Sequence, residues 1–218
     1  MLWVYKHKPE LEQIPHYTKP LLDFATNYSK QKKKALLLHG PAGTGKTAAI
    51  QALAKKTGLE LIEVNASDYR NADEINSKIG NAIKQQSLFA TSKIILVDEL
   101  DGISGTEDRG GIAALASLIQ QSKFPIILIA NDPWDSKFNP LRTKSILIEF
   151  PAINMTEMVP VLQRILEKEK IKADEIVIKT LARRSGGDLR GAITDLQTLS
   201  QINALTVKGL ETLHEREH

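Results

Sequence analysis

The amino-acid sequence predicts an α/β fold, with a five-stranded parallel sheet flanked by helices and a small all-helical domain after it. Segments that favour helices alternate with segments that favour strands. The helix candidates lie near residues 19–30, 46–57, 72–87 and 111–122, and the strand candidates near 35–39, 59–65, 93–98, 125–130 and 145–150. Several strand candidates are unbroken runs of Ile, Leu and Val. Such runs are typical of strands buried on both faces, and the helices between them imply right-handed crossovers that join parallel strands.

The pattern changes after residue 150, where no further strand is predicted and three helices follow. The first helix begins near Thr156, so that Pro160 falls at the end of its first turn, and it has apolar residues at helical spacing. The second runs from about 174 to 185 and ends at a pair of glycines, and the third has Asp188 as its N-cap. The predicted organisation is an α/β domain over 1–151, a small helical domain over 152–208, and a tail or linker over 209–218.

Composition limits the class of protein. The chain has 218 residues, of which 42% are hydrophobic and 25% charged, as in ordinary globular proteins. The net charge of +3 is too small to indicate nucleic-acid binding by itself. The absence of cysteine excludes disulfides and thiolate metal sites and favours an intracellular location. No apolar run approaches the roughly 20 residues of a membrane helix, so we expect no membrane partner.

A glycine-rich segment carries the strongest functional signal. Gly40-Pro41-Ala42-Gly43-Thr44-Gly45-Lys46-Thr47 fits the phosphate-binding pattern G-x-x-x-x-G-K-[ST] at every fixed position, between a strand candidate and a helix candidate. Glycines let backbone N–H groups close around phosphate oxygens, and the helix N-terminus favours the same anion. Lys46 can reach the β- and γ-phosphates, and the Thr47 hydroxyl can bind Mg²⁺. The alternative, a glycine-rich loop that only begins a helix, is disfavoured because all fixed positions match in context.

Polar residues at the ends of other elements are further candidates. Asp98 and Glu99 end an apolar strand, and ligands of parallel sheets bind outside the carboxyl ends of the strands. Asp98 can hold Mg²⁺ through water, and Glu99 can orient or deprotonate an attacking water. Asn131, after the strand candidate 125–130, either hydrogen-bonds the γ-phosphate or the water, or begins a turn. Arg190 opposes the dipole in the first turn of a helix, so it either reaches an anion on the other domain or is a surface arginine.

Three further segments are similar to one known family. Leu2-Trp3-Val4-Tyr5-Lys6 begins the chain, and Asn65-Ala66-Ser67-Asp68 follows the second strand. The third is Asp98-Glu99-Leu100-Asp101-Gly102-Ile103-Ser104-Gly105, followed by Glu107-Asp108-Arg109-Gly110-Gly111. With the glycine loop, these segments resemble the AAA+ ATPases and, within them, the clamp loaders, most of all the large subunit of archaeal replication factor C. The resemblance runs from Trp3 to about Val207 and implies a P-loop AAA+ domain followed by a helical lid.

The resemblance implies ATP or ADP with Mg²⁺ as the cofactors, and ATP hydrolysis as the activity. The Walker A motif then corresponds to Gly40–Thr47 with Ala48, and the Walker B motif to Asp98 and Glu99. Asn131 matches sensor 1, and Arg190 matches sensor 2. Asn65 matches the polar residue that holds the Walker B glutamate inactive until ligands are in place. The residues expected around the nucleotide base are Val4, Tyr5, Ile14 and Leu189.

One departure from the family concerns catalysis between subunits. Small clamp-loader subunits carry Ser-Arg-Cys before the last strand, and its arginine completes a neighbour's site. The matching stretch here is Thr143-Lys144-Ser145, and lysine lacks the planar fork of arginine. This indicates that the chain donates no arginine finger, as expected of a large subunit. Arg142 lies beside the matching position, so the choice between Arg142 and Lys144 stays open. The family's collar domain is expected to follow near Lys208, which makes this chain a part of a longer protein.

The partners implied by the resemblance are replication factor C small subunits, the sliding clamp PCNA and primer–template DNA. Contacts to the DNA backbone need Arg, Lys and backbone amides. Arg70 and Arg109 are the candidates for them, and the alternative is that both are solvated loop residues. By family analogy the clamp-facing surface lies near Leu118, Ile119 and Phe124, which can equally belong to the core.

Three functions fit these features. The main hypothesis is an ATPase subunit that drives loading of the ring clamp at primer–template junctions. The second is an ATP-gated module that binds DNA and clamp with little hydrolysis of its own; the intact Lys46, Asp98, Glu99 and Asn131 favour hydrolysis instead. Hydrolysis by this chain alone is expected to be slow, because an arginine finger in trans contributes roughly 10³–10⁵ in rate. The third is another AAA+ DNA motor such as a branch-migration helicase, which the stretch 107–111 disfavours.

Overall fold

The computed structural model describes residues 1–68, 72–84, 92–103 and 110–211. The chain divides into two compact units. The sheet unit comprises Pro9–Gly40 and Lys46–Phe150, and the helical unit comprises Met1–Lys8, Pro41–Gly45 and Pro151–His218. The first eight residues and part of the glycine loop therefore group with the C-terminal helices, whereas the sequence predicted continuous domains with a boundary near 151.

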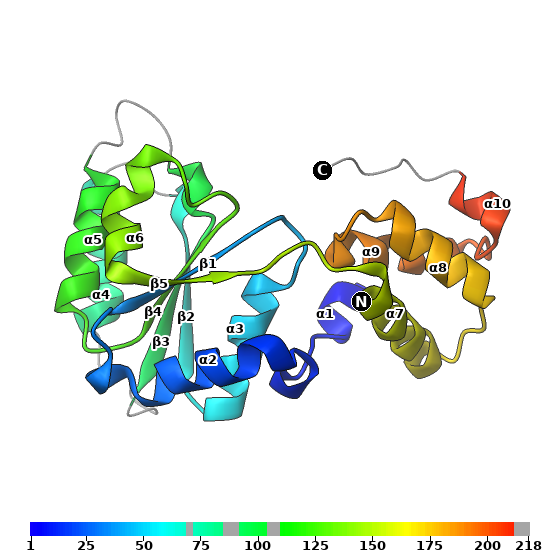
Figure 1. The fold of residues 1–218 in the computed structure, drawn as a ribbon, viewed down its shortest axis with the longest axis horizontal. Helices are drawn as coiled ribbons and strands as arrows, with labels where there is room; N and C mark the ends of the chain where they lie inside the picture. Colours follow the sequence, from blue (N-terminus) through cyan, green and yellow to red (C-terminus); the bar gives the residue numbers. More distant parts are fainter. Residues whose placement is uncertain (69–71, 85–91, 104–109, 212–218) are drawn as a thin grey trace. The chain divides into compact units, whose positions relative to one another are not determined.

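The sheet has five parallel strands in the order β2-β3-β4-β1-β5 (Figure 1). They are β1 (Ala35–His39), β2 (Glu60–Asn65), β3 (Lys93–Asp98), β4 (Ile126–Ala130) and β5 (Ser145–Glu149). The predicted fold class is confirmed, and each predicted strand is correct to within one residue at either end. Leu37 of β1 lies opposite Leu128 on one side and Leu147 on the other, which makes β1 an interior strand.

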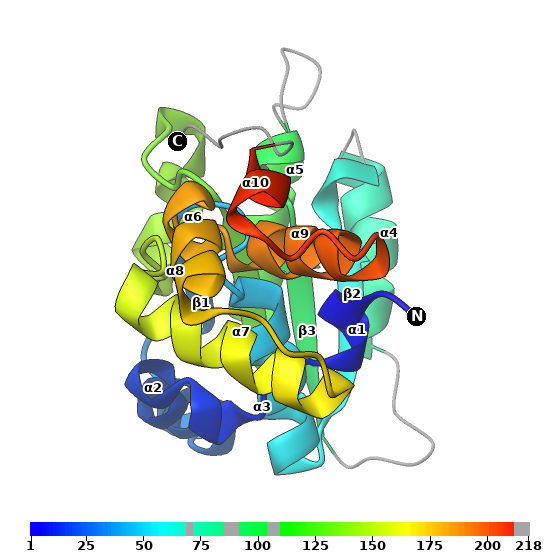
Figure 2. The ribbon, with the colours of Figure 1, turned by 90° about the vertical axis from the view of Figure 1, so that its right-hand side faces the viewer.

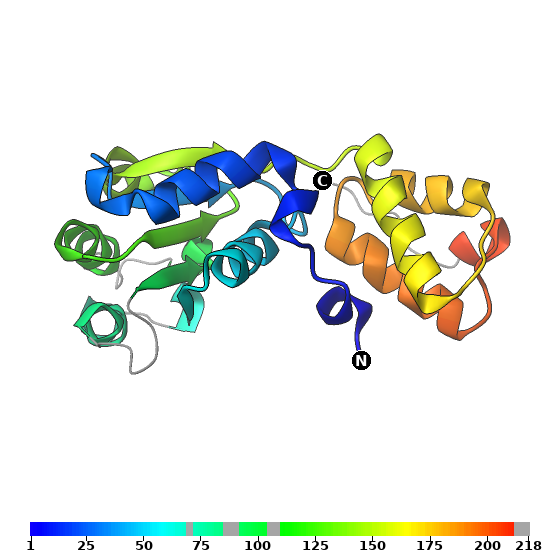
Figure 3. The same cartoon turned by 90° about the horizontal axis from the view of Figure 1, so that it is seen from below.

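Helices cover both faces of the sheet (Figures 1 and 3). On one face Leu37, Val97 and Leu128 pack in a core with α4 (Ala72–Lys84), α5 (Gly111–Gln121) and α6 (Asn139–Lys144). On the other face Leu36 and Ile127 pack in a core with α2 (Pro15–Thr26) and α3 (Lys46–Thr57). Alternate residues of one strand thus enter opposite cores, which is why the strands read as unbroken apolar runs.

In this unit the structure corrects the bounds of one predicted helix and decides one choice that the sequence left open. The helix predicted over 19–30 begins earlier, at Pro15, because proline suits the first helical position, and it ends at Thr26 before η2 (Tyr28–Lys30). For Leu118 and Ile119 of α5 the sequence left two alternatives, a clamp-facing surface by family analogy or the core; their exposures are 9% and 0%, and they belong to the core. Phe124 is partly buried against the same core.

The helical unit contains α1 (Trp3–Lys6), α7 (Met155–Glu169), α8 (Glu175–Arg184), α9 (Leu189–Gln201) and α10 (Val207–Leu210) (Figure 2). The three predicted helices are confirmed, and Asp188 caps α9 by accepting the N–H of Gly191 at 2.8 Å. Trp3 is buried in the apolar core that α7, α8 and α9 form. Its backbone N–H donates to Gln197 Oε1 at 2.8 Å. Helix α10 was not predicted, because four residues are too few to show a helical period.

No helix in the described part of the chain is long and apolar enough to cross a membrane.

Candidate active site

The glycine loop begins where the connections of two neighbouring strands leave the sheet over opposite faces. The chain after β1 enters α3 on one face, and the chain after β4 passes through η6 (Ser136–Phe138) into α6 on the other. The pairing of β1 with β4 ends at His39 opposite Ala130, and beyond it the Gly40 N–H donates to the Asn131 carbonyl at 3.2 Å. Such a point at the carboxyl ends of the strands is the usual ligand crevice of a parallel sheet.

The first glycine of the loop is required by close packing. Gly40 has a φ of +131°, and a Cβ there would lie 2.0 Å from the carbonyl oxygen of Phe150. The Phe150 N–H donates to the His39 carbonyl at 2.7 Å, which holds the chain after β5 against the end of β1. Only glycine fits this position without moving the backbone.

Lys46, Thr47 and Asp98 meet where β1 and β3 end. Lys46 is only 6% exposed, and its Nζ donates to the Gly40 carbonyl at 2.7 Å. The Thr47 hydroxyl donates to Asp98 Oδ2 at 2.7 Å, so the structure brings these predicted residues together. An ammonium, a hydroxyl and a carboxylate at one helix N-terminus are the donor set that fits a magnesium-bound phosphate.

The two acidic residues after β3 have different surroundings. Asp98 also accepts the Glu99 N–H through Oδ1 at 2.8 Å, so both of its carboxylate oxygens are engaged. Glu99 has a φ of 55° and a ψ of 44°, a left-handed conformation that is uncommon for a non-glycine residue. That conformation turns the exposed Glu99 side chain away from the path of the strand, toward the end of β2. The local strain is of order 1–3 kcal/mol, a feature that clusters at functional sites.

The Glu99 carboxylate is held by one side chain at the end of β2 and one just after it. Its Oε2 accepts from Asn65 Nδ2 at 3.0 Å and lies 3.0 Å from the Ser67 hydroxyl. Asn65 and Asp98 are neighbours in the β2–β3 ladder, which places Asn65 beside the acidic pair. Ser67, in η3 (Ala66–Asp68), also lies 2.7 Å from Asn65 Oδ1, and its single hydroxyl proton serves one acceptor at a time. The sequence reasoning assigned a role to Asn65 but none to Ser67.

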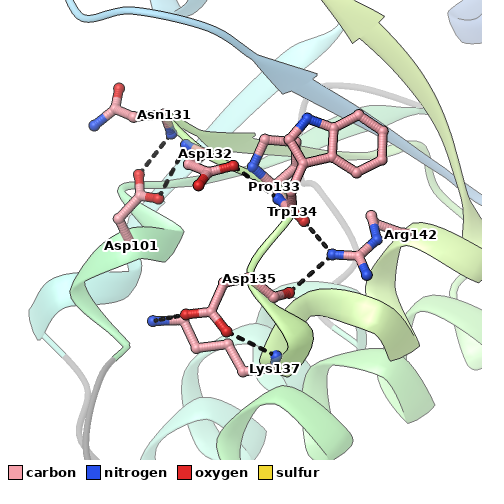
Figure 4. Close-up of polar contacts among 8 residues, drawn as sticks. All are labelled: Asp101, Asn131, Asp132, Pro133, Trp134, Asp135, Lys137 and Arg142. Carbon is pink, nitrogen blue, oxygen red and sulfur yellow. Dashed lines mark hydrogen bonds and ion pairs between the residues drawn. The ribbon is translucent and has the colours of Figure 1, made fainter.

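Asn131 is exposed, and its backbone is fixed from two sides. Its carbonyl accepts from Gly40, and its N–H donates to Asp101 Oδ2 at 2.6 Å (Figure 4). Asp101 lies in η4 (Leu100–Gly102) and also accepts the Asp132 N–H at 3.4 Å. The sequence reasoning missed Asp101, although it stands only three residues beyond Asp98.

Arg142 is engaged within its own chain. Its guanidinium donates to the backbone carbonyls of Pro133 and Asp135, the latter at 2.8 Å, and lies 5.7 Å from the centre of the Trp134 ring (Figure 4). It therefore braces the loop between β4 and α6. Lys144, the other candidate for a residue that acts in trans, is half-buried at the end of α6.

The charges around the loop also act on His39. Burial lowers the pKa of His39 below its ordinary value, and the Lys46 ammonium lowers it further, against the opposing carboxylates of Glu149 and Asp132. The imidazole is therefore neutral at neutral pH and adds no positive charge beside Lys46.

The remaining predicted site residues are divided between the units. Val4, Tyr5, Leu189 and Arg190 belong to the helical unit, and Ile14 belongs to the sheet unit. Tyr5 is 61% exposed, whereas Val4 and Leu189 are packed partly against the helical core and Ile14 against a core of the sheet unit. Within the helical unit, the backbone N–H of Arg190 donates to the Gly43 carbonyl at 3.3 Å. The candidate DNA contacts, Arg70 and Arg109, lie outside the described residues.

The fold and the Lys46–Thr47–Asp98 arrangement define a nucleotide-binding ATPase class. Residues 36–151 match the family described as "ATPase family associated with various cellular activities (AAA)". Residues 160–201 match the "RCF1/5-like, AAA+ ATPase lid domain". The chain therefore belongs to the AAA family.

The curated relatives are more specific. The chain is 46% identical to "Replication factor C large subunit" of Nanoarchaeum equitans, covering 97% of this chain and 50% of that protein. It is 42% identical to the protein of the same name from Staphylothermus marinus, covering 91% and 48%. These matches confirm the family resemblance, and the chain spans about half the length of the relatives.

A solved structure is similar in fold alone. The structure of a RuvB variant from Thermotoga maritima aligns with a TM-score of 0.74 over 94% of this chain and 72% of that one, at 17% identity.

Proposed function

We propose that this chain is the ATP-binding and ATP-hydrolysing part of a replication factor C large subunit, which uses ATP to load the ring clamp PCNA onto primer–template DNA inside the cell. The observation that carries the proposal is the 2.7 Å hydrogen bond from Thr47 to Asp98 beside the buried Lys46. The names of the relatives support the clamp-loader assignment over another AAA+ DNA motor.

In this proposal the glycine loop, from Gly40 through Ala48, binds the phosphates of ATP or ADP. Lys46 pairs with the β- and γ-phosphates. To do so, its Nζ gives up the hydrogen bond to the Gly40 carbonyl. Thr47 and, through water, Asp98 would hold Mg²⁺, which would supply positive charge that neutralises the phosphates. Mg²⁺ usually keeps several waters and takes few protein ligands, which suits this small donor set.

Glu99 orients or deprotonates the attacking water, and Asn131 senses the γ-phosphate. The hydrogen bonds of Glu99 to Asn65 and Ser67 support a resting arrangement in which the carboxylate is held away from that water. Turnover then requires these bonds to break, which makes hydrolysis conditional on ligands. Arg190 acts as sensor 2, and Val4, Tyr5, Ile14 and Leu189 surround the base.

A neighbouring subunit supplies the arginine finger for this site. Arg142 is engaged by two carbonyls of its own loop, and Lys144 has no planar fork, which supports a subunit that receives an arginine finger and donates none. Arg70 and Arg109 are proposed to contact the DNA backbone.

The proposal is tested by magnesium-dependent nucleotide binding and by turnover with partners. We expect Asp98→Asn to remove most of the gain in ADP affinity that Mg²⁺ gives to the wild type. Turnover of ATP is expected to be weak in the chain alone and to rise by roughly 10³–10⁵ when small subunits supply a finger. Equal ADP affinity with and without Mg²⁺ in the wild type contradicts the site assignment. Turnover that stays weak with small subunits, clamp and DNA all present favours the ATP-gated binding module.

A further inference from the structure

Asp101 links the end of β4 to the segment that follows the acidic pair. Its Oδ2 accepts the Asn131 N–H at 2.6 Å, and its Oδ1 lies 3.4 Å from the Asp132 nitrogen (Figure 4). Both bonds are made to the backbone, so they set where the chain at 131 and 132 runs and leave the Asn131 carboxamide free of this contact. Carboxylate bonds to N–H groups are among the stronger hydrogen bonds in proteins.

This link lies where the sheet no longer holds the two strands together. The paired residues of β3 and β4 end at Val97 and Leu128, whereas the pairing of β1 with β4 continues to Ala130. Beyond that point Asn131 is joined to the glycine loop through the Gly40 N–H and to the β3 side through Asp101. The backbone of Asn131 is thus the common point of three strand ends, and Asp101 supplies its connection to β3.

The loop after Asn131 is fixed by further contacts that do not involve Asp101. The Asp132 carboxylate accepts the backbone N–H of Trp134 at 2.9 Å. The Asp135 carboxylate caps η6 by accepting the backbone N–H of Lys137 at 3.0 Å. Loss of Asp101 therefore releases the first residues of the loop while the later part keeps its shape. Asp135 offers a matched control, because its carboxylate also accepts a backbone N–H in the loop after Asn131 but makes no bond to Asn131.

We propose that Asp101 is a positioning residue for ATP hydrolysis, which holds the Asn131 side chain in register with the glycine loop and Glu99. This inference rests on the proposed function, since it assumes that Asn131 acts on the γ-phosphate or the attacking water. Asp101 binds no nucleotide itself. Its effect on turnover therefore passes through Asn131, and its effect on ADP affinity is small.

The first test is a kinetic cycle with Mg-ATP. Asp101→Ala is expected to lower the hydrolysis rate roughly 10- to 100-fold, the cost of a misplaced catalytic group, while ADP affinity stays within about twofold. Asp101→Asn keeps one acceptor oxygen, so its hydrolysis rate is expected to lie between those of the wild type and Asp101→Ala. The rate of Asp135→Ala is expected to match that of the wild type. In an Asn131→Ala background, Asp101→Ala is expected to have no further effect. An equal loss in both backgrounds overturns the proposal, because Asp101 then acts on another group.

A second readout separates this inference from the proposed function. Amide hydrogen exchange at Asn131 is expected to accelerate roughly tenfold or more in Asp101→Ala and to stay unchanged in Asp135→Ala. Unchanged exchange at Asn131 overturns the positioning role, whether or not the chain hydrolyses ATP. A wild type that hydrolyses no ATP even with small subunits, clamp and DNA present, with accelerated exchange in the variant, overturns the proposed function and with it the catalytic half of the inference, while the backbone link stands.

Discussion

Lys46 offers a direct test of the glycine loop. It is the first residue of α3, it is buried, and its Nζ donates to the Gly40 carbonyl at 2.7 Å. The substitution Lys46→Ala keeps a strong helix former at this position. The hydrogen bond that is lost has a charged donor and contributes about 1.5–3 kcal/mol, and the relieved desolvation of the ammonium offsets most of this loss. We therefore expect the free energy of unfolding without nucleotide to change by no more than about 1 kcal/mol.

The effect on nucleotide binding is expected to be far larger. A hydrogen bond to a charged group contributes about 1.5–3 kcal/mol, and Lys46 reaches two phosphates, so the loss is about 3–6 kcal/mol. Since 1.4 kcal/mol corresponds to a tenfold change, the dissociation constant of Mg-ADP should rise about 10²- to 10⁴-fold. This contrast, a nearly unchanged fold with a lost ligand, distinguishes a phosphate-binding lysine from a structural one.

The assay is isothermal titration calorimetry with Mg-ADP, with thermal unfolding of the same samples. Lys55→Ala is the control, because Lys55 lies on the same helix and pairs with Glu10 at 2.7 Å with a side chain that is 72% exposed. An exposed pair of this kind contributes at most about 1 kcal/mol, and we expect no change in ADP affinity. Binding of Mg-ADP by folded Lys46→Ala within threefold of the wild type would show that Lys46 does not bind the phosphates.

Three other predictions concern the fold of the sheet unit. In Gly40→Ala the new Cβ would lie 2.0 Å from the Phe150 carbonyl oxygen, at a φ of +131°. This substitution should lower the free energy of unfolding, measured in urea, by about 3 kcal/mol or more, and a loss below 1 kcal/mol would contradict the close packing of Gly40. Arg142→Ala should lower the fluorescence anisotropy of Trp134, measured with Trp3→Phe in both chains, because its loop loses two carbonyl contacts; unchanged anisotropy contradicts the brace. Burial raises the pKa of Tyr28 to about 12, so the folded state keeps the phenol proton that the unfolded state loses near pH 10. Stability should fall between pH 10 and 12 in the wild type and fall less in Tyr28→Phe; parallel falls in the two proteins contradict this cause.

Much of the fold and the centre of the site are visible in the sequence because they rest on local signals. Runs such as Ile94-Ile95-Leu96-Val97 are apolar at every position, since alternate residues enter the two cores of the sheet unit. The parallel order then brings the carboxyl ends of the strands together. For that reason the amino-acid sequence alone predicts that Thr47 and Asp98, 51 residues apart, lie close together.

The features that the sequence did not reveal depend on contacts between distant polar residues. Asp101 meets Asn131 across 30 residues, and Ser67 meets Glu99 across 32, with no periodic pattern to mark either pair. The contacts of Arg142 with the carbonyls of Pro133 and Asp135 also leave no mark in the sequence. The grouping of Met1–Lys8 with the C-terminal helices likewise depends on a single turn around Trp3, whose four-residue helix shows no period.

The central claim is that Glu99 carries out hydrolysis at a site where Lys46, Thr47 and Asp98 hold the nucleotide. Single-turnover conversion of γ-labelled ATP, with protein in excess over nucleotide, measures this directly in the wild type and in Glu99→Gln. Both proteins are expected to bind Mg-ATP with the same affinity, and only the wild type is expected to convert the bound ATP to ADP and phosphate. Conversion at equal rates in the two proteins would show that Glu99 does not carry out hydrolysis.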